Sequence, residues 1–254
     1  MKYIGEEKKY DWSPTCISRV FLLVFVSILA YGLALFPAIL LLYYTIQFLR
    51  FHIIVNLLLL SFLVVIAFLL LVTSFILSSA LFINLFNLKY KEGEYGKSLH
   101  DKTAFKFALC FALYFPTYKL INIFDLPPVK SWYLSLIGCK IGKNVFLAGE
   151  EWITDPCVIE IGENTMIGGR TIISGHLAED KLRVKKVTIG KNCLIGGDSF
   201  IMPGAVIEDN VVVGARSLVT KNQHLKKGKT YLGIPAREVQ SPKAPSSSKS
   251  PTKK

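Results

Sequence analysis

Apolar residues recur with a strict period of six between residues 187 and 220. An aliphatic residue opens each hexad, and a small or β-branched residue follows four positions later in five of them. This fixed period is typical of a parallel β-helix, in which each hexapeptide forms one short strand and three strands make a triangular coil. The predicted inward positions are Ile189, Ile195, Ile201, Ile207, Val213 and Val219, with Cys193, Ser199, Ala205, Val211 and Ser217 as the small ones.

The same pattern begins earlier in the chain, with two interruptions. A slip of two residues separates the first two groups of hexads, and residues 178–186 break the period again before it resumes. We therefore expect about four coils, with glycines after the aliphatic positions allowing unusual turn dihedrals. The earlier hexads begin at Ile141, Leu147, Ile153, Ile161, Ile167 and Ile173, and the glycines are Gly190, Gly196 and Gly214.

Two long apolar runs precede the repeats. Residues 20–49 and 53–88 contain no Asp, Glu, Lys or Arg, and each exceeds the roughly 20 residues that a membrane-spanning helix needs. The short connection around Arg50 predicts an antiparallel hairpin. Both flanks carry more Lys and Arg than this tip, so both ends and the β-helix are predicted to be cytoplasmic in a multi-pass membrane protein.

Residues 103–124 are apolar and aromatic but are interrupted by Lys106, Pro116 and Lys119. This pattern favours an amphipathic segment in the membrane interface. The alternative is a third span, which would place the β-helix on the other side of the membrane.

The predicted fold class is therefore mixed membrane and β: a transmembrane helical hairpin followed by a parallel β-helix. The expected parts are an N-terminal flank (1–19), the hairpin (20–88), a linker with the amphipathic segment (89–125), the β-helix (126–239) and a disordered basic tail (240–254).

Charge and cysteine content narrow the possible partners. The net charge is +12, and residues 221–254 contribute +8 of it, with nine Lys or Arg against one acid. No nucleic-acid motif accompanies this charge, which favours anionic lipid or a phosphorylated cofactor. The five cysteines match no zinc pattern, and Cys193 is predicted to be a buried filler.

His176 is the strongest candidate for chemistry, because it stands where the period is interrupted. Loops on rigid scaffolds often carry function, and Glu179 or Asp180 could orient the imidazole for general-base work. The alternative is an ordinary solvated loop histidine. His224, just after the last repeat, is predicted to be a solvated turn residue.

Beyond these patterns, the chain resembles a known family. The segments SLIGCKIGKNVFL, SGHLAEDKL and GIPA, with the repeats between them, are similar to hexapeptide-repeat acyltransferases over residues 126–239. Their order further resembles a membrane-associated branch that includes the carboxy-terminal regions of poly-lysine-type non-ribosomal peptide synthetases. One departure is Gly175, where the commoner family motif has Asn.

The resemblance implies a left-handed coil, a homotrimer with intersubunit sites, an acyl-CoA donor, with acetyl-CoA as the expected one, and no metal. It implies that His176 is the general base, with Glu179 or Asp180 as partner. It further implies that residues 233–236 close the prism near the nucleotide and that a backbone N–H holds the oxyanion. The cofactor-binding candidates are Gly196, Gly197, Gly214, Ser217, Lys221, Gly233, Pro235, Ala236 and Arg237.

The leading functional hypothesis is a membrane-anchored O- or N-acyltransferase that acts on a small-molecule or lipid-linked hydroxyl or amine. The alternative is a non-catalytic trimeric scaffold at the membrane. A β-helical zinc enzyme is disfavoured, because such a site takes three histidines and the repeat domain has only His176 and His224. Membrane lipid is an expected partner and nucleic acid is not.

Overall fold

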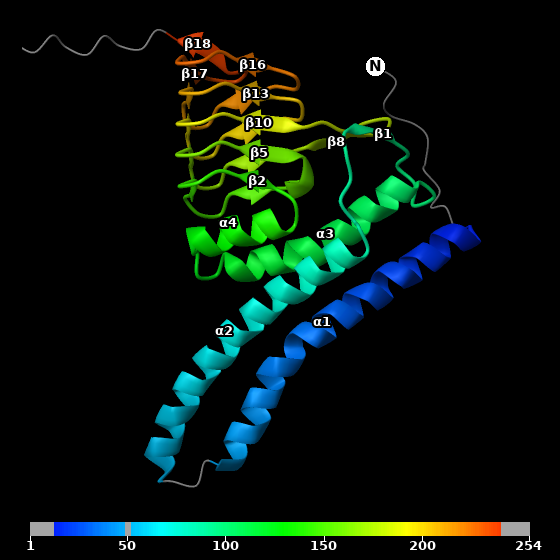
Figure 1. Ribbon diagram of the computed structural model, residues 1–254, viewed down its shortest axis with the longest axis vertical. Coiled ribbons are helices and arrows are strands. Elements are labelled where there is room, and N and C mark those ends of the chain that lie inside the picture. The colour runs from blue at the N-terminus through cyan, green and yellow to red at the C-terminus, as the bar shows by residue number, and fades with distance from the viewer. Residues whose placement is uncertain (1–12, 49–51, 240–254) are drawn as a thin grey trace, which may run out of the picture.

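The computed structural model describes residues 13–48 and 52–239. The basic tail expected at residues 240–254 lies outside the described residues. From the N-terminus, the chain forms two long helices, two shorter helices, and then a stack of short strands (Figure 1).

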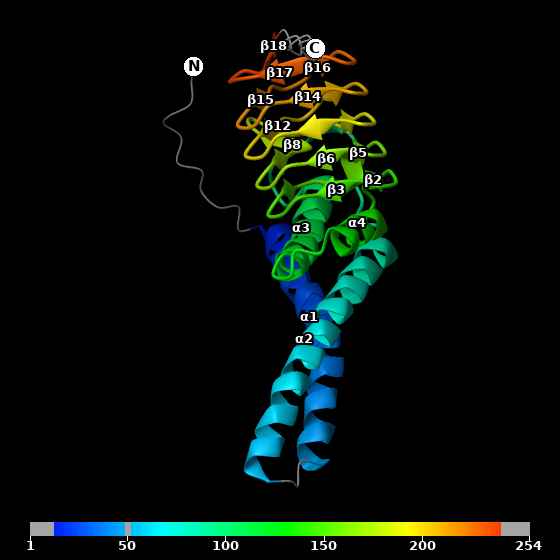
Figure 2. The same ribbon diagram turned by 90° about the vertical axis from the view of Figure 1, so that its left-hand side faces the viewer.

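The two apolar runs form the predicted antiparallel hairpin, made of α1 (Pro14–Phe48) and α2 (Ile53–Leu85). α1 begins six residues before the uncharged run, and it bends part-way along its length (Figure 1). Figure 2 shows the hairpin leading away from the strands, and most of its large apolar side chains are exposed. By length and composition, both helices and also α3 (Lys102–Ile121) are long and apolar enough to cross a membrane.

α3 and α4 (Pro127–Leu136) lie across the lower end of the strand stack. The face of α3 that carries Leu113 and Tyr114 is buried, and the Tyr114 hydroxyl donates a hydrogen bond to the Ile153 carbonyl at 2.6 Å. One face of α3 is therefore packed against the first coil. Its placement in the membrane interface stays a prediction.

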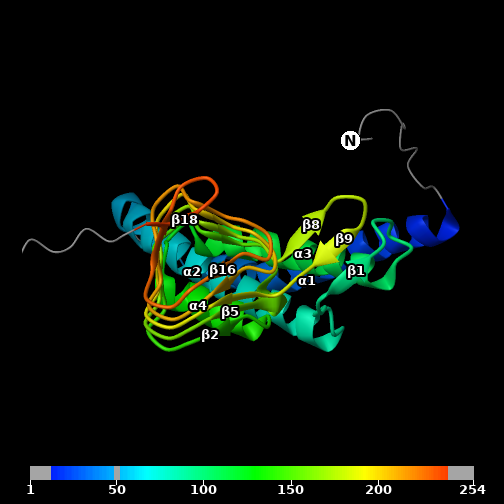
Figure 3. The same cartoon turned by 90° about the horizontal axis from the view of Figure 1, so that it is seen from above.

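The repeats form a β-helix with three faces, which Figure 3 shows end-on as a triangle. Strands stack in parallel on each face, and β18 (Arg237–Val239) adds an antiparallel edge to face two. Face one contains β2 (Lys140–Ile141), β5 (Ile159–Ile161), β10 (Val187–Ile189), β13 (Val206–Ile207) and β16 (His224–Leu225). Face two contains β3 (Phe146–Leu147), β6 (Met166–Ile167), β11 (Leu194–Ile195), β14 (Val212–Val213) and β17 (Thr230–Leu232). Face three contains β4 (Trp152–Ile153), β7 (Ile172–Ile173), β12 (Phe200–Ile201) and β15 (Leu218–Val219).

The predicted register is confirmed residue by residue. On face three, for example, Ile153, Ile173, Ile201 and Val219 are directly paired in neighbouring strands, and all four are fully buried. The predicted small inward residues are buried as well, including Cys193, whose pKa is raised by burial.

The predicted role of the glycines needs a correction. Gly190, Gly196 and Gly214 do not have positive φ angles; the left-handed conformation falls two positions later, as at Asn192 (φ 53°) and Asp198 (φ 58°). Asn and Asp tolerate this region better than most residues. The glycines are instead needed for close approach, since a Cβ on Gly196 would lie 2.3 Å from the backbone nitrogen of the next coil.

The predicted loop over residues 177–186 is an antiparallel hairpin rather than an irregular loop. β8 (His176–Ala178) pairs with β9 (Leu182–Val184), and β9 pairs with β1 (Gly93–Tyr95) from the segment that follows α2. We call this three-stranded sheet the arm. Figure 3 shows it projecting beyond the prism, above α3 and α1. The arm therefore joins the β-helix to the helical part of the chain.

Candidate active site

Both interruptions of the six-residue period fall at the same corner of the prism, between face three and face one. Here, Ile153 and Ile161 are eight residues apart, and the 3-10 turn η1 (Pro156–Val158) absorbs the excess. One coil higher, the arm leaves the prism after Ile173. Because Ile153 pairs with Ile173, the residues that follow each of them lie on adjacent coils. We call this place the His176 corner.

The His176 corner contains a histidine–carboxylate pair. His176 Nδ1 lies 2.7 Å from Asp155 Oδ2; the Asp155 side chain is fully buried and the His176 side chain is 24% exposed. Asp155 also accepts hydrogen bonds from the Gly175 N–H at 2.9 Å, from the Tyr90 hydroxyl at 2.7 Å and from the Thr154 hydroxyl. The carboxylate is therefore buried but saturated with donors, which is the condition for burying a charge.

These bonds decide the charge of Asp155. Burial by itself would raise the pKa of this carboxyl, but the hydrogen bond and charge of His176, with the bonds from Thr154 and Tyr90, hold the pKa below its usual value. Burial and the nearby Asp155 raise the pKa of Tyr90, so that its hydroxyl stays protonated and donates. An ionised Asp155 favours a proton on Nδ1 of His176, which leaves Nε2 free to accept one.

The expectation that Glu179 or Asp180 orients His176 is therefore corrected to Asp155. Both acids lie on the arm and pair with Arg183, where Asp180 Oδ1 is 2.7 Å from the guanidinium. They point to the arginine because β8 and β9 are antiparallel strands joined by a tight turn, which places residues on either side of the turn together. They hold the arm in shape.

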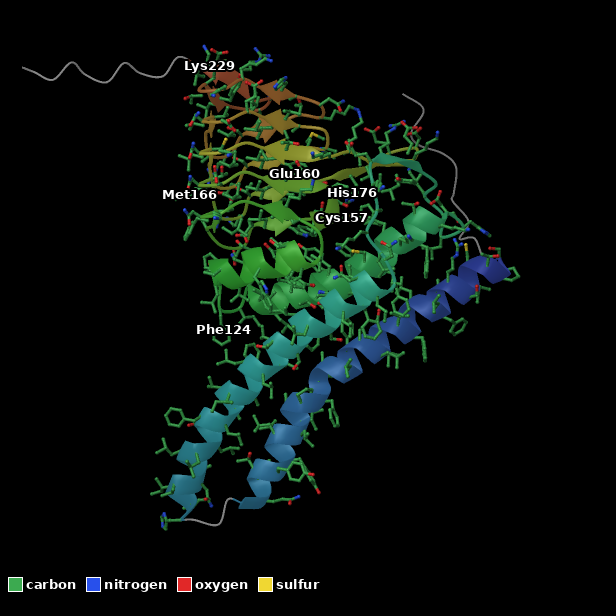
Figure 4. The ribbon with its side chains drawn as sticks, viewed as in Figure 1. Phe124, Cys157, Glu160, Met166, His176 and Lys229 are labelled. Atoms are coloured by element: carbon green, nitrogen blue, oxygen red, sulfur yellow. The ribbon has the colours of Figure 1, made fainter. Side chains whose placement is uncertain are left out.

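Two more residues at the His176 corner escape sequence reasoning because they are distant in the chain. Tyr90 follows α2, and Phe107 of α3 meets the His176 ring edge-on with 4.8 Å between ring centroids. The sequence did contain a signal for Asp155, because this residue lies in the two-residue slip between Ile153 and Ile161, one coil below His176. Cys157 is on the same side of the molecule (Figure 4), but burial raises its pKa to about 11, so its thiol is neutral at pH 7.

The candidates for cofactor binding are divided between two corners. Gly196, Gly197 and Gly214 lie at the corner between faces two and three, and the Gly196 N–H is already bonded to the Val213 carbonyl. The Gly196 N–H is therefore already used within the coil. Ser217 is buried inside the prism, where its hydroxyl accepts the Gly233 N–H.

Lys221 lies at the His176 corner two coils above the histidine and reaches Glu179 of the arm at 3.4 Å. Residues 233–236 run beside β15: the Ala236 N–H bonds to the Leu218 carbonyl, and Ala236 is buried. These residues therefore close the upper end of face three. Pro235 follows a cis peptide bond, and Arg237 begins β18 with its side chain exposed.

The second histidine of the repeat domain, His224, is not part of the His176 corner. His224 is in a strand rather than a turn, and its Nε2 lies 2.6 Å from Glu208. Over residues 13–48 and 52–239, no group of three or more His, Cys, Asp or Glu is placed to hold a metal ion.

Comparison with known proteins supports the reading of the repeats. The family described as bacterial transferase hexapeptide (six repeats) matches residues 186–221. The galactoside O-acetyltransferase of Escherichia coli (strain K12) is 34% identical over 126 residues, which cover 46% of this chain and 60% of that protein. The resemblance to hexapeptide-repeat acyltransferases is confirmed.

Two further proteins show how far the similarity extends. The delta-poly-L-ornithine synthetase of Acinetobacter baumannii (strain AB307-0294) is 26% identical over 107 residues, covering 42% of this chain but 8% of that protein. The solved maltose O-acetyltransferase from Clostridium difficile 630 superposes with a TM-score of 0.40 at 22% identity, over 49% of this chain and 84% of that one. The chain thus spans 60% of the galactoside O-acetyltransferase and 8% of the delta-poly-L-ornithine synthetase.

Proposed function

We propose that this protein is a membrane-anchored acyltransferase that moves an acetyl or other acyl group from acyl-CoA to a hydroxyl or amine. The observation that carries the proposal is the His176–Asp155 pair, held at the one corner where the repeat is interrupted twice. A curated relative named as a galactoside O-acetyltransferase supports acetyl transfer to a hydroxyl.

In the proposed reaction, Nε2 of His176 takes the proton of the acceptor hydroxyl as its oxygen attacks the thioester carbonyl carbon. The new C–O bond forms and the C–S bond breaks. The imidazolium then returns the proton to the departing thiolate. Asp155, which is ionised and bonded to Nδ1, stabilises the imidazolium between these steps.

We propose that the donor lies along the upper part of the His176 corner. Lys221 and Arg237 would hold its phosphates, and residues 233–236 would bound its nucleotide end. Gly197, Gly214 and Ser217 lie near the corner between faces two and three. They would contact the donor only if that corner of a second subunit lies against the His176 corner of the first. We also propose that the coil is left-handed, as in the family.

We propose a homotrimer because face two carries a row of exposed apolar side chains. Phe146, Met166 and Leu194 are each 43–47% exposed and occupy outward positions on successive strands. Met166 lies on the edge of the prism away from His176 (Figure 4). Such patches usually mark protein interfaces. Cross-linking of the full chain should give trimers, and Leu194→Glu should give monomers that lack activity.

The membrane anchor is proposed from the hairpin, with the β-helix on the cytoplasmic side. Both ends of the hairpin lie on the side of the β-helix (Figure 1). A cysteine placed at the exposed Lys229 should react with an impermeant reagent only after cells are opened. Labelling from outside in intact cells would contradict this orientation.

The catalytic proposal is tested with the full chain in detergent, in the presence of acetyl-CoA and a galactoside acceptor. The rate of release of the coenzyme A thiol is measured. His176→Ala should lower kcat by about 10²–10⁴-fold, the usual loss for a positioned general base. His224→Ala is the matched control and should change little. A scaffold would show neither turnover nor coenzyme A binding by calorimetry. Equal and small effects of His176→Ala and His224→Ala on kcat would show that His176 is not the general base.

A further inference from the structure

A row of aromatic side chains runs along α3 and ends at His176. Phe107, Phe111 and Phe115 are four residues apart and therefore share one face of the helix. Their ring centroids are 6.4 Å apart for the first pair and 5.1 Å for the second, and Phe107 is the residue in edge contact with the His176 ring. The phenylalanines alone span about 12 Å of helix.

This row borders the face that packs α3 onto the β-helix core, and Phe107 and Phe115 pack against the edge of that core. Leu113, Tyr114 and Tyr118 are 0–2% exposed and fill that role, whereas the three phenylalanines are only partly buried. α3 therefore has a second apolar face, and this face leads to the proposed base.

The far end of the row opens into a cavity of about 480 Å³. Its apolar lining is Phe115, Ile123, Trp152 and Ile172. The rest of the lining is polar or charged: Tyr118, Lys119, Asn122, Glu150, Glu151 and Arg170. This volume is within the range of ligand pockets. The Trp152 ring lies 5.7 Å from that of Phe115 and extends the aromatic row.

The cavity is continuous with the apolar surface of the hairpin. Ile123 is 62% exposed, and the next residue, Phe124, meets Phe68 of α2 edge-on at 5.3 Å. Figure 4 shows Phe124 at the lower edge of the domain, beside the hairpin. Apolar side chains thus extend from the proposed membrane surface, along one side of this cavity, to His176.

We propose that the acceptor is an amphiphile held in the membrane, whose hydrocarbon chain lies on this row while its hydroxyl or amine reaches Nε2 of His176. The inference rests on the proposed function and names its substrate class. The donor candidates Lys221 and Arg237 lie above the histidine, while the row approaches from below, so the two substrates meet at the base from opposite sides. Phenyl rings offer hydrocarbon contact and no hydrogen bonds, which suits a hydrocarbon chain.

The first test does not require catalysis. The full chain, in nanodiscs of phosphatidylcholine, is photolabelled with decyl galactoside carrying a diazirine at the end of its chain, and the labelled peptides are mapped. We expect labels within residues 107–124 that excess decyl galactoside prevents. Labels confined to the exposed hairpin residues, unaffected by competitor, would overturn the inference.

The second test compares decyl with methyl galactoside as acceptors for acetyl-CoA. Each methylene that becomes buried raises binding about four-fold, so decyl galactoside should have the higher kcat/KM by at least about 100-fold. Phe111→Ala should reduce this ratio by at least tenfold. Phe62→Ala, which removes an exposed ring from α2 (64% exposed), is the matched control and should leave the ratio unchanged.

The outcomes separate the two proposals. Thioester cleavage with equal use of both galactosides and no label on the row would overturn the amphiphile inference and leave the acyltransferase standing. Competed label on the row without any thioester cleavage would support the lipid site and contradict the acyltransferase.

Discussion

The first two coils and the last two coils of the β-helix are built from the same hexapeptide, yet they differ at one corner. In the upper coils the period of six runs unbroken from Ile189 to Val219, and every aliphatic inward residue of that series is at most 1% exposed. In the lower coils the period breaks after Ile153 and after Ile173. The upper coils give a rigid stack, and the interrupted corner places Asp155 against His176.

The comparison teaches that departures from a repeat carry more information about function than the repeat itself. In the unbroken series from Ile189 to Val219, the inward positions hold apolar or small residues, and none of the carboxylates is buried. The two-residue excess at η1 turns Asp155 inward, where four donors surround it. Irregular segments on rigid scaffolds are common sites of function for this reason.

The largest expected effect lies in the regular region and concerns stability. Ile195→Ala removes a fully buried side chain between Ile167 and Val213, and should lower the free energy of unfolding by about 2–5 kcal/mol. The midpoint of unfolding in detergent, followed by circular dichroism, measures it, with the exposed Lys143→Ala as control. The kcat of the folded fraction should not change; a parallel fall in kcat would mean that the two regions are not separable.

The next effect lies at the His176 corner and concerns rate. Asp155→Asn removes the charge that orients His176 and stabilises its protonated form, so kcat should fall roughly 100-fold, less than for His176→Ala. Thiol release from acetyl-CoA measures it. Asp180→Asn is the control, since Asp180 pairs with Arg183 on the arm. An equal loss for both variants would return the arm carboxylates to the mechanism.

A smaller effect is expected for the residue that supports Asp155 from outside the repeats. Tyr90→Phe removes one donor to a buried carboxylate, a bond worth about 1.5–3 kcal/mol, and should lower kcat about tenfold. The acid limb of the pH–rate profile should also move to higher pH, because Asp155 loses a hydrogen bond that lowers its pKa. Tyr95→Phe removes a hydroxyl that bonds to the Lys91 and Glu92 carbonyls, and this variant should leave the profile in place.

The smallest effect is a pH dependence of stability. The pKa of Asp155 is lowered in the folded state, so its contribution is fully present above the unfolded value of about 3.9 and is lost as pH falls through the folded value. The difference in unfolding midpoint between the wild type and Asp155→Asn should be constant from about pH 7 to 5 and shrink below about pH 4. A difference that shrinks already between pH 7 and 5 would show a raised pKa instead.

The amino-acid sequence by itself determined the regular parts of this protein. The hexad positions, the strand register and the choice of His176 as a candidate follow from local periodicity and its breaks, because inward side chains must repeat wherever the backbone does. The hairpin follows from the two long uncharged apolar runs. Cys193 as a buried filler follows from the same rule and is confirmed.

Only the tertiary structure decided what surrounds His176. Phe107 and Asp155 contact the histidine from sequence distances of 69 and 21 residues, and Tyr90, 86 residues away, bonds to Asp155. No periodic pattern records contacts between separate elements. The nearer acids, Glu179 and Asp180, are close in sequence but are turned to Arg183 by the antiparallel arm. Local spacing specifies a strand and its faces, whereas the partner of a side chain at a corner depends on which coil, helix and arm are packed there.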